Sequence, residues 1–251
     1  MRSPTGEPAA SPGWFSRRHA DVPAGHDWLG PRERAVLARQ RFEPRRLAWR
    51  LGRWTAKTAI SDWTGLPLDR FEVLSAGDGA PEAWADGERL PVSVSISHRG
   101  DRAIAVLGAP PMVAGCDLEL IEPRSPAFVR EWLAPAEQEL VASFAQTDHA
   151  LVANLIWTAK EAAAKVRREG LRLDVRAALV GPSGMSARHG GEWRAIRVDW
   201  AGDTHAVFGW WRAEPGWVMT VLADPPPRPP RLLFDAWTPG IARAVQSVVF
   251  P

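Results

Sequence analysis

Two short stretches decide the fold class and the chemistry of this chain, residues 113–120 (VAGCDLEL) and residues 157–165 (WTAKEAAAK). The first alternates between side-chain types with a period of two, which predicts a β-strand. The second has alanine at four of its nine positions and follows an apolar run, which predicts a helix. Both carry charged residues inside an otherwise apolar element, so they are the first places to look for a site.

The strand places two carboxylates on one face. Because successive side chains of a strand point to opposite faces, we expect Cys116, Leu118 and Leu120 in the core and Asp117 and Glu119 together on the other side. Two carboxylates this close repel each other unless a cation or water lies between them. Magnesium prefers oxygen ligands, so the pair is a candidate metal site. The alternative is an ordinary solvated strand face.

The helix places Glu161 four residues before Lys165, hence on the same face. An ordinary surface ion pair, which contributes a few tenths of a kcal/mol, is one interpretation. The other is that the small alanines let a ligand or a backbone approach closely. Glu161 would then supply a third carboxylate next to Asp117 and Glu119, and Lys165 would be left for a phosphate.

A second predicted helix, residues 43–60, has four cations on one stripe, at Arg46, Arg50, Arg53 and Lys57. Like charges at this spacing destabilise a helix, and no acidic residue lies between Glu43 and Lys57. The stripe is either a solvated face or a binding site for a ligand with several phosphates, which arginine recognises through its fork of donors.

Residues 92–100 (VSVSISHRG) predict a strand with one polar face that ends in His98 and a glycine turn. Ser97 and His98 are adjacent and project to opposite sides, which argues against a nucleophile pair between them. His98 is either simply hydrogen-bonded or part of an anion-binding concavity at the strand end.

Composition narrows the function classes. The chain has 251 residues, 45% of them hydrophobic and 24% charged, which is typical of soluble globular proteins. No apolar run reaches 18 residues, and the N-terminal residues have no apolar signal region. The single cysteine, Cys116, excludes an internal disulfide and a cysteine zinc cage, and we expect it in the core. The net charge of +2 does not indicate a nucleic-acid partner, and we expect a cytoplasmic protein.

The predicted elements run helices, strands, helices, strands, which indicates two α+β lobes rather than a regular βαβ array. We expect no internal sequence repeat. The predicted organisation is a flexible N-terminal tail (1–27), an N-terminal lobe (28–111), a C-terminal lobe with the metal site (112–223) and a proline-rich C-terminal extension (224–251).

Taken in order, four motifs resemble the 4′-phosphopantetheinyl transferases of the large, monomeric, two-lobed type. The specific part is G-x-D-x-E followed about forty residues later by W-x-x-K-E-x-x-x-K, with Ser-His upstream. The likeness covers roughly residues 28–223. The motifs are residues 45–57 (RRLAWRLGRWTAK), 95–98 (SISH), 115–119 (GCDLE) and 157–165 (WTAKEAAAK).

The resemblance implies two similar lobes related by a pseudo-twofold, each a small, mostly antiparallel sheet packed with helices, with coenzyme A in the cleft between them. It implies transfer of the 4′-phosphopantetheine arm of coenzyme A to a serine of an apo acyl or peptidyl carrier protein, releasing 3′,5′-ADP. Magnesium, or manganese in its place, is the implied metal. The implied partners are coenzyme A and the carrier protein, with no nucleic acid and no membrane.

By matched position, the resemblance implies that Asp117, Glu119 and Glu161 are the metal ligands and the catalytic residues. Glu161 is the candidate for activating the carrier serine. Glu137, in the helix that follows the strand of Asp117 and Glu119, is a second candidate base. The resemblance also implies the residues that bind coenzyme A: Lys165 at its phosphates, Ser97 and His98 near the 3′-phosphate, Arg46 and Arg53 near the nucleotide, and Arg89 in place of a lysine that the family has before the Ser-His strand.

Two alternatives belong to other function classes. One is a nucleic-acid-binding protein that uses the stripe from Arg46 to Lys57 together with Arg167 and Arg168, and three carboxylates argue against it because they repel a phosphate backbone. The other is a carrier-binding module without catalysis, and the complete set of acidic residues argues against that. The sequence does not indicate whether the carrier serves fatty-acid, polyketide or nonribosomal-peptide synthesis.

Overall fold

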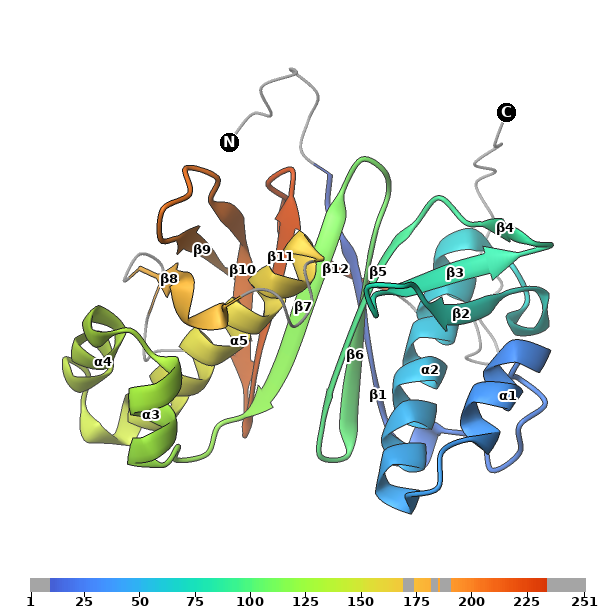
Figure 1. The fold of residues 1–251 in the computed structure, drawn as a ribbon, viewed down its shortest axis with the longest axis horizontal. Coiled ribbons are helices and arrows are strands. Elements are labelled where there is room, and N and C mark those ends of the chain that lie inside the picture. The colour runs from blue at the N-terminus through green and yellow to red at the C-terminus, as the bar shows by residue number, and fades with distance from the viewer. Residues whose placement is uncertain (1–9, 169–173, 182–184, 186–190, 234–251) are drawn as a thin grey trace.

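The computed structural model describes residues 10–168, 174–181, 185 and 191–233. These residues form a mixed α+β molecule, as the sequence predicted, with two sheets at the centre and helices on their outer faces (Figure 1). The α-helices are α1 (Pro31–Ala38), α2 (Glu43–Thr64), α3 (Pro126–Trp132), α4 (Pro135–Ala142) and α5 (His149–Arg167), and short 3₁₀ helices lie at His19–Asp21, Leu68–Arg70, Gln146–Asp148 and Val175–Ala177. The strands are β1 (Gly13–Arg18), β2 (Glu72–Ser75), β3 (Pro81–Ala85), β4 (Glu88–Arg89), β5 (Ser93–Arg99), β6 (Arg102–Gly108), β7 (Val113–Leu120), β8 (Ala178–Val180), β9 (Arg194–Trp200), β10 (Val207–Glu214), β11 (Trp217–Asp224) and β12 (Arg231–Leu232).

The strands form one sheet for each half of the chain and a small third sheet. The N-terminal sheet has the order β12-β1-β6-β5, and the C-terminal sheet has the order β7-β11-β10-β9-β8. The third sheet, β2-β3-β4, is a meander beside the N-terminal one. All neighbouring strands are antiparallel except β1 and β12. The chain crosses from one large sheet to the other between β6 and β7.

A row of serine side chains joins the two large sheets. Strands β5 and β7 are edge strands of different sheets and lie side by side, but no backbone ladder connects them. Instead, alternate serines of β5 accept hydrogen bonds from alternate backbone N–H groups of β7. The pairs are Ala114 to Ser93 at 2.9 Å, Cys116 to Ser95 at 2.9 Å and Leu118 to Ser97 at 3.2 Å. The polar face that the sequence predicted on this strand is therefore the seam between the sheets.

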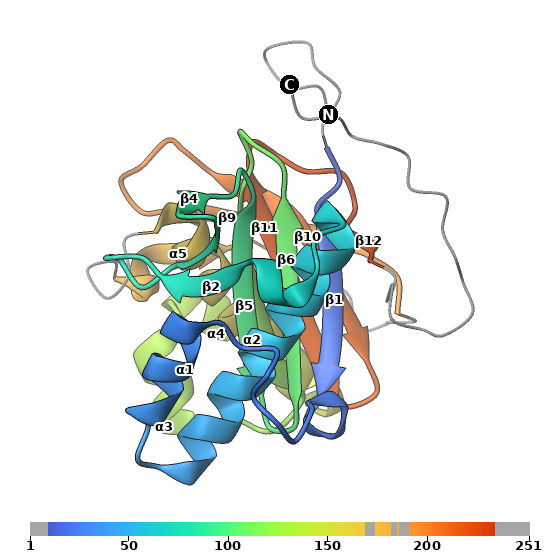
Figure 2. The same cartoon turned by 90° about the vertical axis from the view of Figure 1, so that its right-hand side faces the viewer.

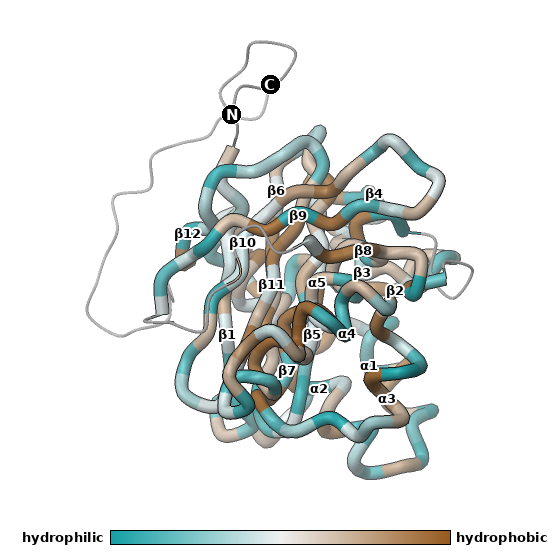
Figure 3. Tube along the Cα trace, turned by 90° about the vertical axis from the view of Figure 1, so that its left-hand side faces the viewer, coloured by the Kyte–Doolittle hydropathy of each residue, from teal (hydrophilic) through white to brown (hydrophobic). Residues whose placement is uncertain are grey.

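Three apolar clusters stabilise this arrangement. One lies under α2, which covers the outer face of β1, β6 and β5 (Figure 2). Another lies between α5 and the C-terminal sheet. In the third, the remaining faces of the two large sheets pack together, with Trp14 and Ile104 from one and Cys116 and Met219 from the other. The hydrophobic stretches of the chain accordingly gather along the strands and the inner side of α5 (Figure 3).

The N-terminal lobe contains a fully buried ion pair. The ammonium of Lys57 on α2 lies 2.9 Å from the Glu33 carboxylate on α1 and donates to the carbonyl of Phe71 at 2.6 Å. Glu33 also accepts the backbone N–H groups of Gly30 and Val73. One carboxylate thus fastens α1 to α2 and to β2, with its hydrogen-bonding capacity used.

The C-terminal lobe repeats this ion pair. The ammonium of Lys160 on α5 lies 2.6 Å from the Glu137 carboxylate on α4 and donates to the carbonyl of Trp132. Glu137 accepts the backbone N–H groups of Ala134 and Val180, which correspond to Gly30 and Val73 in their positions. The same buried contact therefore organises both lobes.

The expectation of no internal repeat is wrong. Residues 28–33 (WLGPRE) and 132–137 (WLAPAE) share the pattern W-L-x-P-x-E, and WTAK occurs at both 54–57 and 157–160. The two patterns supply the two partners of the repeated ion pair: W-L-x-P-x-E ends in its glutamate and WTAK ends in its lysine. The signal was present in the sequence as two short patterns rather than one continuous repeat.

Two of the predicted boundaries need correction. The predicted tail, residues 1–27, contains β1, which lies inside the N-terminal sheet between β12 and β6. The predicted C-terminal extension, residues 224–251, contains β12, which pairs with β1. Both strands were missed because they are short and adjoin runs rich in proline and glycine. Residues 1–9 of the predicted tail and 234–251 of the predicted extension lie outside the described residues. None of the described helices is long and apolar enough to cross a membrane.

Candidate functional site

The glycine of G-x-D-x-E lets α5 lie directly on β7. A Cβ atom at Gly115 would stand 2.1 Å from the carbonyl oxygen of Ala162, so only glycine fits. The alanines of α5 are the other half of this contact, because they let the helix backbone come close to the strand. The approach brings Glu161 and Lys165 to the face of β7 that carries Asp117.

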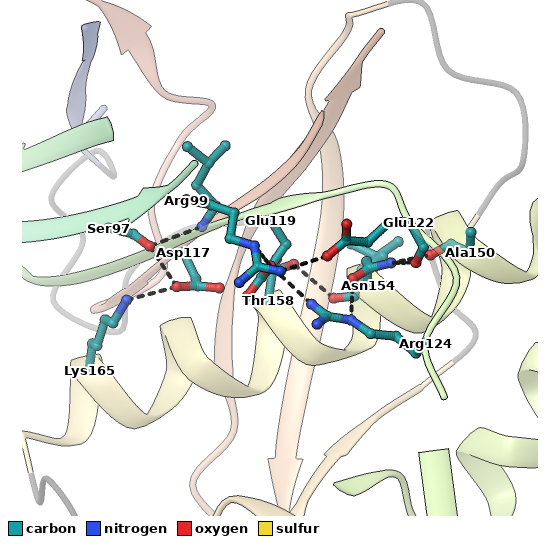
Figure 4. A network of polar contacts seen from close by, with 12 residues as sticks. Ser97, Arg99, Asp117, Glu119, Glu122, Arg124, Ala150, Asn154, Thr158 and Lys165 are labelled. Carbon is teal, nitrogen blue, oxygen red and sulfur yellow. Dashed lines mark hydrogen bonds and ion pairs between the residues drawn. The ribbon is translucent and has the colours of Figure 1, made fainter. Parts of the chain in front are cut away.

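Asp117 lies at the centre of a polar network on this face (Figure 4). It is 6% exposed. Its Oδ1 accepts hydrogen bonds from the Ser97 hydroxyl at 2.7 Å and from the Lys165 ammonium at 2.9 Å. Lys165 also donates to the carbonyl of Cys116. Desolvation lowers the pKa of Lys165, but the charge and hydrogen bond of Asp117, together with Cys116 and Glu161, outweigh it, so the pKa is raised.

Glu119 lies two residues further along the same face, between two arginines. Its Oε2 is 3.3 Å from the Arg99 guanidinium and 2.9 Å from that of Arg124. Arg99 also donates to Glu122 at 2.6 Å, and Arg124 donates to Asn154 at 2.6 Å (Figure 4). Two cations that the sequence did not assign to the site therefore hold this carboxylate.

Of the three carboxylates Asp117, Glu119 and Glu161, the last is the one that has no ion-pair partner among the described residues. Its pKa is raised, first by desolvation and then by the neighbouring Asp117 carboxylate, with Lys165 opposing and Glu119 adding to the shift. Two of these influences come from carboxylates of β7, a strand remote from Glu161 in the sequence. A desolvated carboxylate among like charges favours either a proton or a cation.

The residues fit a hard divalent cation in their chemistry. Asp117 Oδ2 is buried and accepts no hydrogen bond from the described residues, which leaves a charged oxygen unsatisfied. Magnesium takes such oxygen ligands. In their present arrangement, however, no three Asp, Glu, His or Cys side chains of the described residues stand together as a ready metal cluster. Lys165 and the two arginines occupy the neighbouring space instead.

A cavity of about 1180 Å³ opens beside this network, between the two lobes. Its lining includes residues 92–96, at the start of β5, and residues 112–114, at the start of β7. The cavity therefore follows the row of serines that joins these two strands. Of the predicted site residues, Glu161, Lys165 and Arg89 line it. Trp132 and Trp157 give one wall an aromatic surface. The cavity is large enough for a cofactor-sized ligand.

Ser97 and His98 lie at the edge of the network rather than in the cavity lining. Ser97 is buried, and its hydroxyl makes two hydrogen bonds: it donates to the Asp117 carboxylate and accepts from the backbone N–H of Leu118. His98 points to the opposite, exposed side, as the strand alternation predicted. Its pKa is lowered, first by partial desolvation and then by the Lys165 ammonium. Ser97 thus positions Asp117, a role that the sequence did not indicate.

The cationic stripe of α2 does not form an open basic face. Arg46 pairs with Glu43, and Arg50 donates to backbone carbonyls of residues 23–25. Arg53 is 8% exposed and stacks over Trp49, while Lys57 is the buried partner of Glu33. None of the four lines the cavity. The stripe's contacts are therefore with the chain itself, and Glu33, remote in sequence, supplies the negative charge next to Lys57.

Two further residues discussed from the sequence, Glu137 and Cys116, are buried in the core. Glu137, the second candidate base, is bound to Lys160 in the core and is therefore a structural residue. Cys116 is fully buried, as expected, and desolvation raises the pKa of its thiol to about 11, so it is not a nucleophile at neutral pH.

Sequence reasoning missed the charged residues that line the outer part of the cavity: Asp78, Glu82, Arg168, Asp174 and Arg176. The first two lie on the β2–β3 hairpin and the others at and after the end of α5. No motif marks them, and the contacts of Arg168 with Asp78 and Glu82 join segments that are far apart in the chain.

Residues 114–204 match the family model described as the 4′-phosphopantetheinyl transferase superfamily. The matched segment begins in β7 and contains all of α5, so it includes Asp117, Glu119, Glu161 and Lys165. The N-terminal lobe lies outside the match.

Among solved structures, the chain is similar to a holo-(acyl-carrier-protein) synthase from Bacillus anthracis str. Ames in complex with CoA (3′,5′-ADP). The two share 23% sequence identity over 39% of this chain and 94% of the other, with a TM-score of 0.34. No curated protein sequence matches the chain.

Proposed function

We propose that this chain, whose residues 114–204 carry a domain of the 4′-phosphopantetheinyl transferase superfamily, transfers the phosphopantetheine arm of coenzyme A to a carrier protein. The acceptor is a serine hydroxyl of an acyl or peptidyl carrier, and the product released is 3′,5′-ADP. The observation that carries the proposal is the desolvated Glu161 beside Asp117 and Lys165, on the wall of a cavity large enough for coenzyme A.

The transfer replaces a phosphoanhydride bond of coenzyme A by a phosphoester bond to the carrier serine. The serine oxygen forms a bond to the phosphorus that bears the pantetheine, while the bond from that phosphorus to the bridging oxygen of 3′,5′-ADP breaks. The serine proton must leave during this step, and a carboxylate with a raised pKa is a better acceptor than an ordinary one. Glu161 meets this requirement, so we assign the proton to its carboxylate.

The remaining charged residues manage the negative charge of the diphosphate. Asp117, Glu119 and Glu161 would hold a magnesium ion, which neutralises phosphate charge when it is bound. Lys165 lines the cavity with its ammonium and can bind a phosphate oxygen directly. Ser97 holds Asp117 at a fixed orientation from the neighbouring lobe. Phosphoryl transfer depends mostly on such positioning and charge neutralisation.

The same proposal includes a monomeric, cytoplasmic enzyme. Both walls of the cavity come from one chain, since β3–β5 supply one side and β7 and α5 the other. No second copy is needed to complete the site. A single buried cysteine is also compatible with a reducing compartment.

The direct test is incubation of the protein with coenzyme A, Mg²⁺ and purified apo carrier proteins of the fatty-acid, polyketide and nonribosomal-peptide types. Mass spectrometry of the carriers should show a gain of one phosphopantetheine in at least one of them, together with release of 3′,5′-ADP. A carrier whose acceptor serine is replaced by alanine is the control. No mass gain in any carrier, with metal and coenzyme A in excess, contradicts the proposal.

A further inference from the structure

The last residue of the α5 region, Arg168, has an unusual backbone conformation. It is the C-cap of the helix with φ of +54°, in the left-handed region that glycine normally occupies at this position. Among the described residues, Asp86 alone shares a positive φ without being glycine, and aspartate tolerates that conformation better. A strained arginine persists where its contacts hold it in place.

Those contacts cross from one lobe to the other. The Arg168 guanidinium donates to both oxygens of Asp78, at 2.9 and 3.2 Å, and to Glu82 at 3.2 Å. Asp78 and Glu82 belong to the β2–β3 hairpin of the N-terminal lobe. Glu82 is also 2.9 Å from Arg89. The Arg168 pairs are partly buried, with side-chain exposures of 34% for Arg168, 23% for Asp78 and 14% for Glu82.

All four residues of this cluster line the interlobe cavity. Every cation in the described lining is already paired with a carboxylate. Lys165 pairs with Asp117, Arg176 with Asp174, and Arg89 and Arg168 with the hairpin acids. A ligand that carries several phosphates therefore meets no unpaired cation in this cavity, and it binds only by taking a cation from a carboxylate.

We propose that Arg168 is a phosphate-binding residue of this cavity and that Asp78 and Glu82 compete with the ligand for its guanidinium. The inference rests on the proposed function, because coenzyme A supplies the phosphates. Arginine binds phosphate in the same two-pronged manner as carboxylate, so the ligand offers an equivalent partner with more negative charge. Ligand binding then exchanges the interlobe ion pair for an arginine–phosphate pair.

Arg168 suits this exchange better than the other outer cations. Arg176 pairs with Asp174 two residues away and is exposed, so releasing it changes nothing between the lobes. Arg89 contacts Glu82 through one nitrogen and lies on β4, in the same small sheet as the hairpin. Arg168 reaches across the cavity from α5, the helix that also carries Glu161 and Lys165, so a phosphate bound there adjoins the reacting end of the site.

The competition predicts opposite effects for the two partners. Arg168→Gly removes the guanidinium and also relieves the left-handed backbone, so its melting temperature should stay close to that of the wild type. Its dissociation constant for coenzyme A and for 3′,5′-ADP, measured by isothermal titration calorimetry, should rise about tenfold. Asp78→Asn and Glu82→Gln remove the competitor and should lower the same constants about threefold each.

The matched control is the Arg197–Asp199 pair on β9, which is exposed, local and outside the cavity. Asp199→Asn and Arg197→Ala should leave both dissociation constants within about twofold of the wild type, as expected for a surface pair. If the hairpin variants weaken binding, as Arg168→Gly does, the cluster is only structural and the proposal is overturned. Unchanged binding in Arg168→Gly overturns it as well.

The experiment also distinguishes failure of the proposed transferase function from failure of the assignment of Arg168. If wild-type protein does not bind coenzyme A, inorganic pyrophosphate replaces it as the probe. Weaker pyrophosphate binding in Arg168→Gly and tighter binding in Asp78→Asn would still support competition at Arg168, while transfer from coenzyme A would be rejected. Absence of pyrophosphate binding in the wild type overturns the assignment of Arg168.

Discussion

Among single residues, Glu161 differs most from its counterpart in the other lobe. It follows the lysine of the second WTAK pattern, whereas Thr58 follows that of the first. Thr58 donates its hydroxyl to backbone carbonyls of its own helix and is satisfied there. Glu161 is desolvated beside other carboxylates and has no such partner among the described residues. The carboxylate that we propose as the proton acceptor thus lies on a structural frame that both lobes share.

Glu161→Gln should abolish transfer and at the same time stabilise the protein in the absence of metal. Desolvation and the neighbouring carboxylates disfavour the ionised form of Glu161, and glutamine removes that charge while keeping the shape. The measurements are carrier mass for activity and thermal unfolding in EDTA for stability. Transfer at the wild-type rate would remove Glu161 from the mechanism.

The stabilisation should depend on pH in a defined direction. A carboxyl whose pKa is raised in the folded state favours folding at low pH, where it is protonated in both states, and loses this advantage as pH rises through its folded pKa. The melting temperature of Glu161→Gln relative to the wild type should therefore increase from acid toward neutral pH and then level off. The exposed Glu139→Gln is the control, for which no such trend is expected.

Lys165→Ala should raise the KM for coenzyme A by about tenfold without raising the KM for the carrier protein. Its ammonium lines the cavity and is 32% exposed, so its removal affects the ligand more than the core. Steady-state kinetics with each substrate varied in turn measures both constants. Equal increases in the two constants would mean that Lys165 acts only through Asp117.

The sequence predicted which side chains of β7 and of α5 share a face, but not the partners of the acidic residues. Alternation in β7 and the four-residue step in α5 follow from local geometry, which a single sequence contains. The arginines around Glu119 and the hairpin acids around Arg168 come from other elements, so only the fold shows them. The same reason explains the error at the α2 stripe, whose neutralising Glu33 lies in a different helix.

Among the elements, the serine seam between β5 and β7 makes a separate prediction. Ser95→Ala leaves the buried N–H of Cys116 without an acceptor, which should cost about 1–3 kcal/mol of stability. Chemical denaturation measures this loss. Ser143→Ala, at an exposed position at the end of α4, should change stability by less than about 0.5 kcal/mol. A Ser95 variant as stable as the Ser143 variant would show that the seam is not a source of stability.

The long, regular elements were predicted correctly, whereas two strands near the ends of the described chain were missed. The strands at residues 92–100 and 113–120 and the helices at residues 43–60 and 157–165 were recognised from their pattern, and β5, β7, α2 and α5 lie there. The two-residue strand β12 has no period to recognise. Its partner β1 reads GWFSRR, which contains too little alternation to separate it from a loop.

For the whole molecule, the duplicated ion pair predicts that the two lobes respond alike to equivalent changes. Lys57→Met and Lys160→Met each leave a buried carboxylate without its cation, so each should destabilise the protein by about 3–5 kcal/mol. Urea unfolding of both variants measures this. Asp86→Asn, which breaks the exposed pair with Arg70, should cost less than about 1 kcal/mol. Similar stability of all three variants would contradict the structural role of the buried pairs.

The two repeated patterns are present in the sequence, but the sequence analysis did not recognise them as a duplication. Its two patterns are short, are separated by unrelated loops and flank a region where the lobes differ. Only the fold shows that W-L-x-P-x-E and WTAK meet in space, because glutamate and lysine in each lobe come from different helices.

The seam of serines also explains why there is room for a ligand between the lobes. Strands joined by backbone hydrogen bonds run about 4.8 Å apart, and such a sheet would be continuous across the molecule. Here the hydroxymethyl groups of Ser93 and Ser95 act as spacers, and both residues line the cavity. Because a side-chain hydroxyl replaces a carbonyl along this edge, the two sheets stay separate, and the cavity lies along their junction.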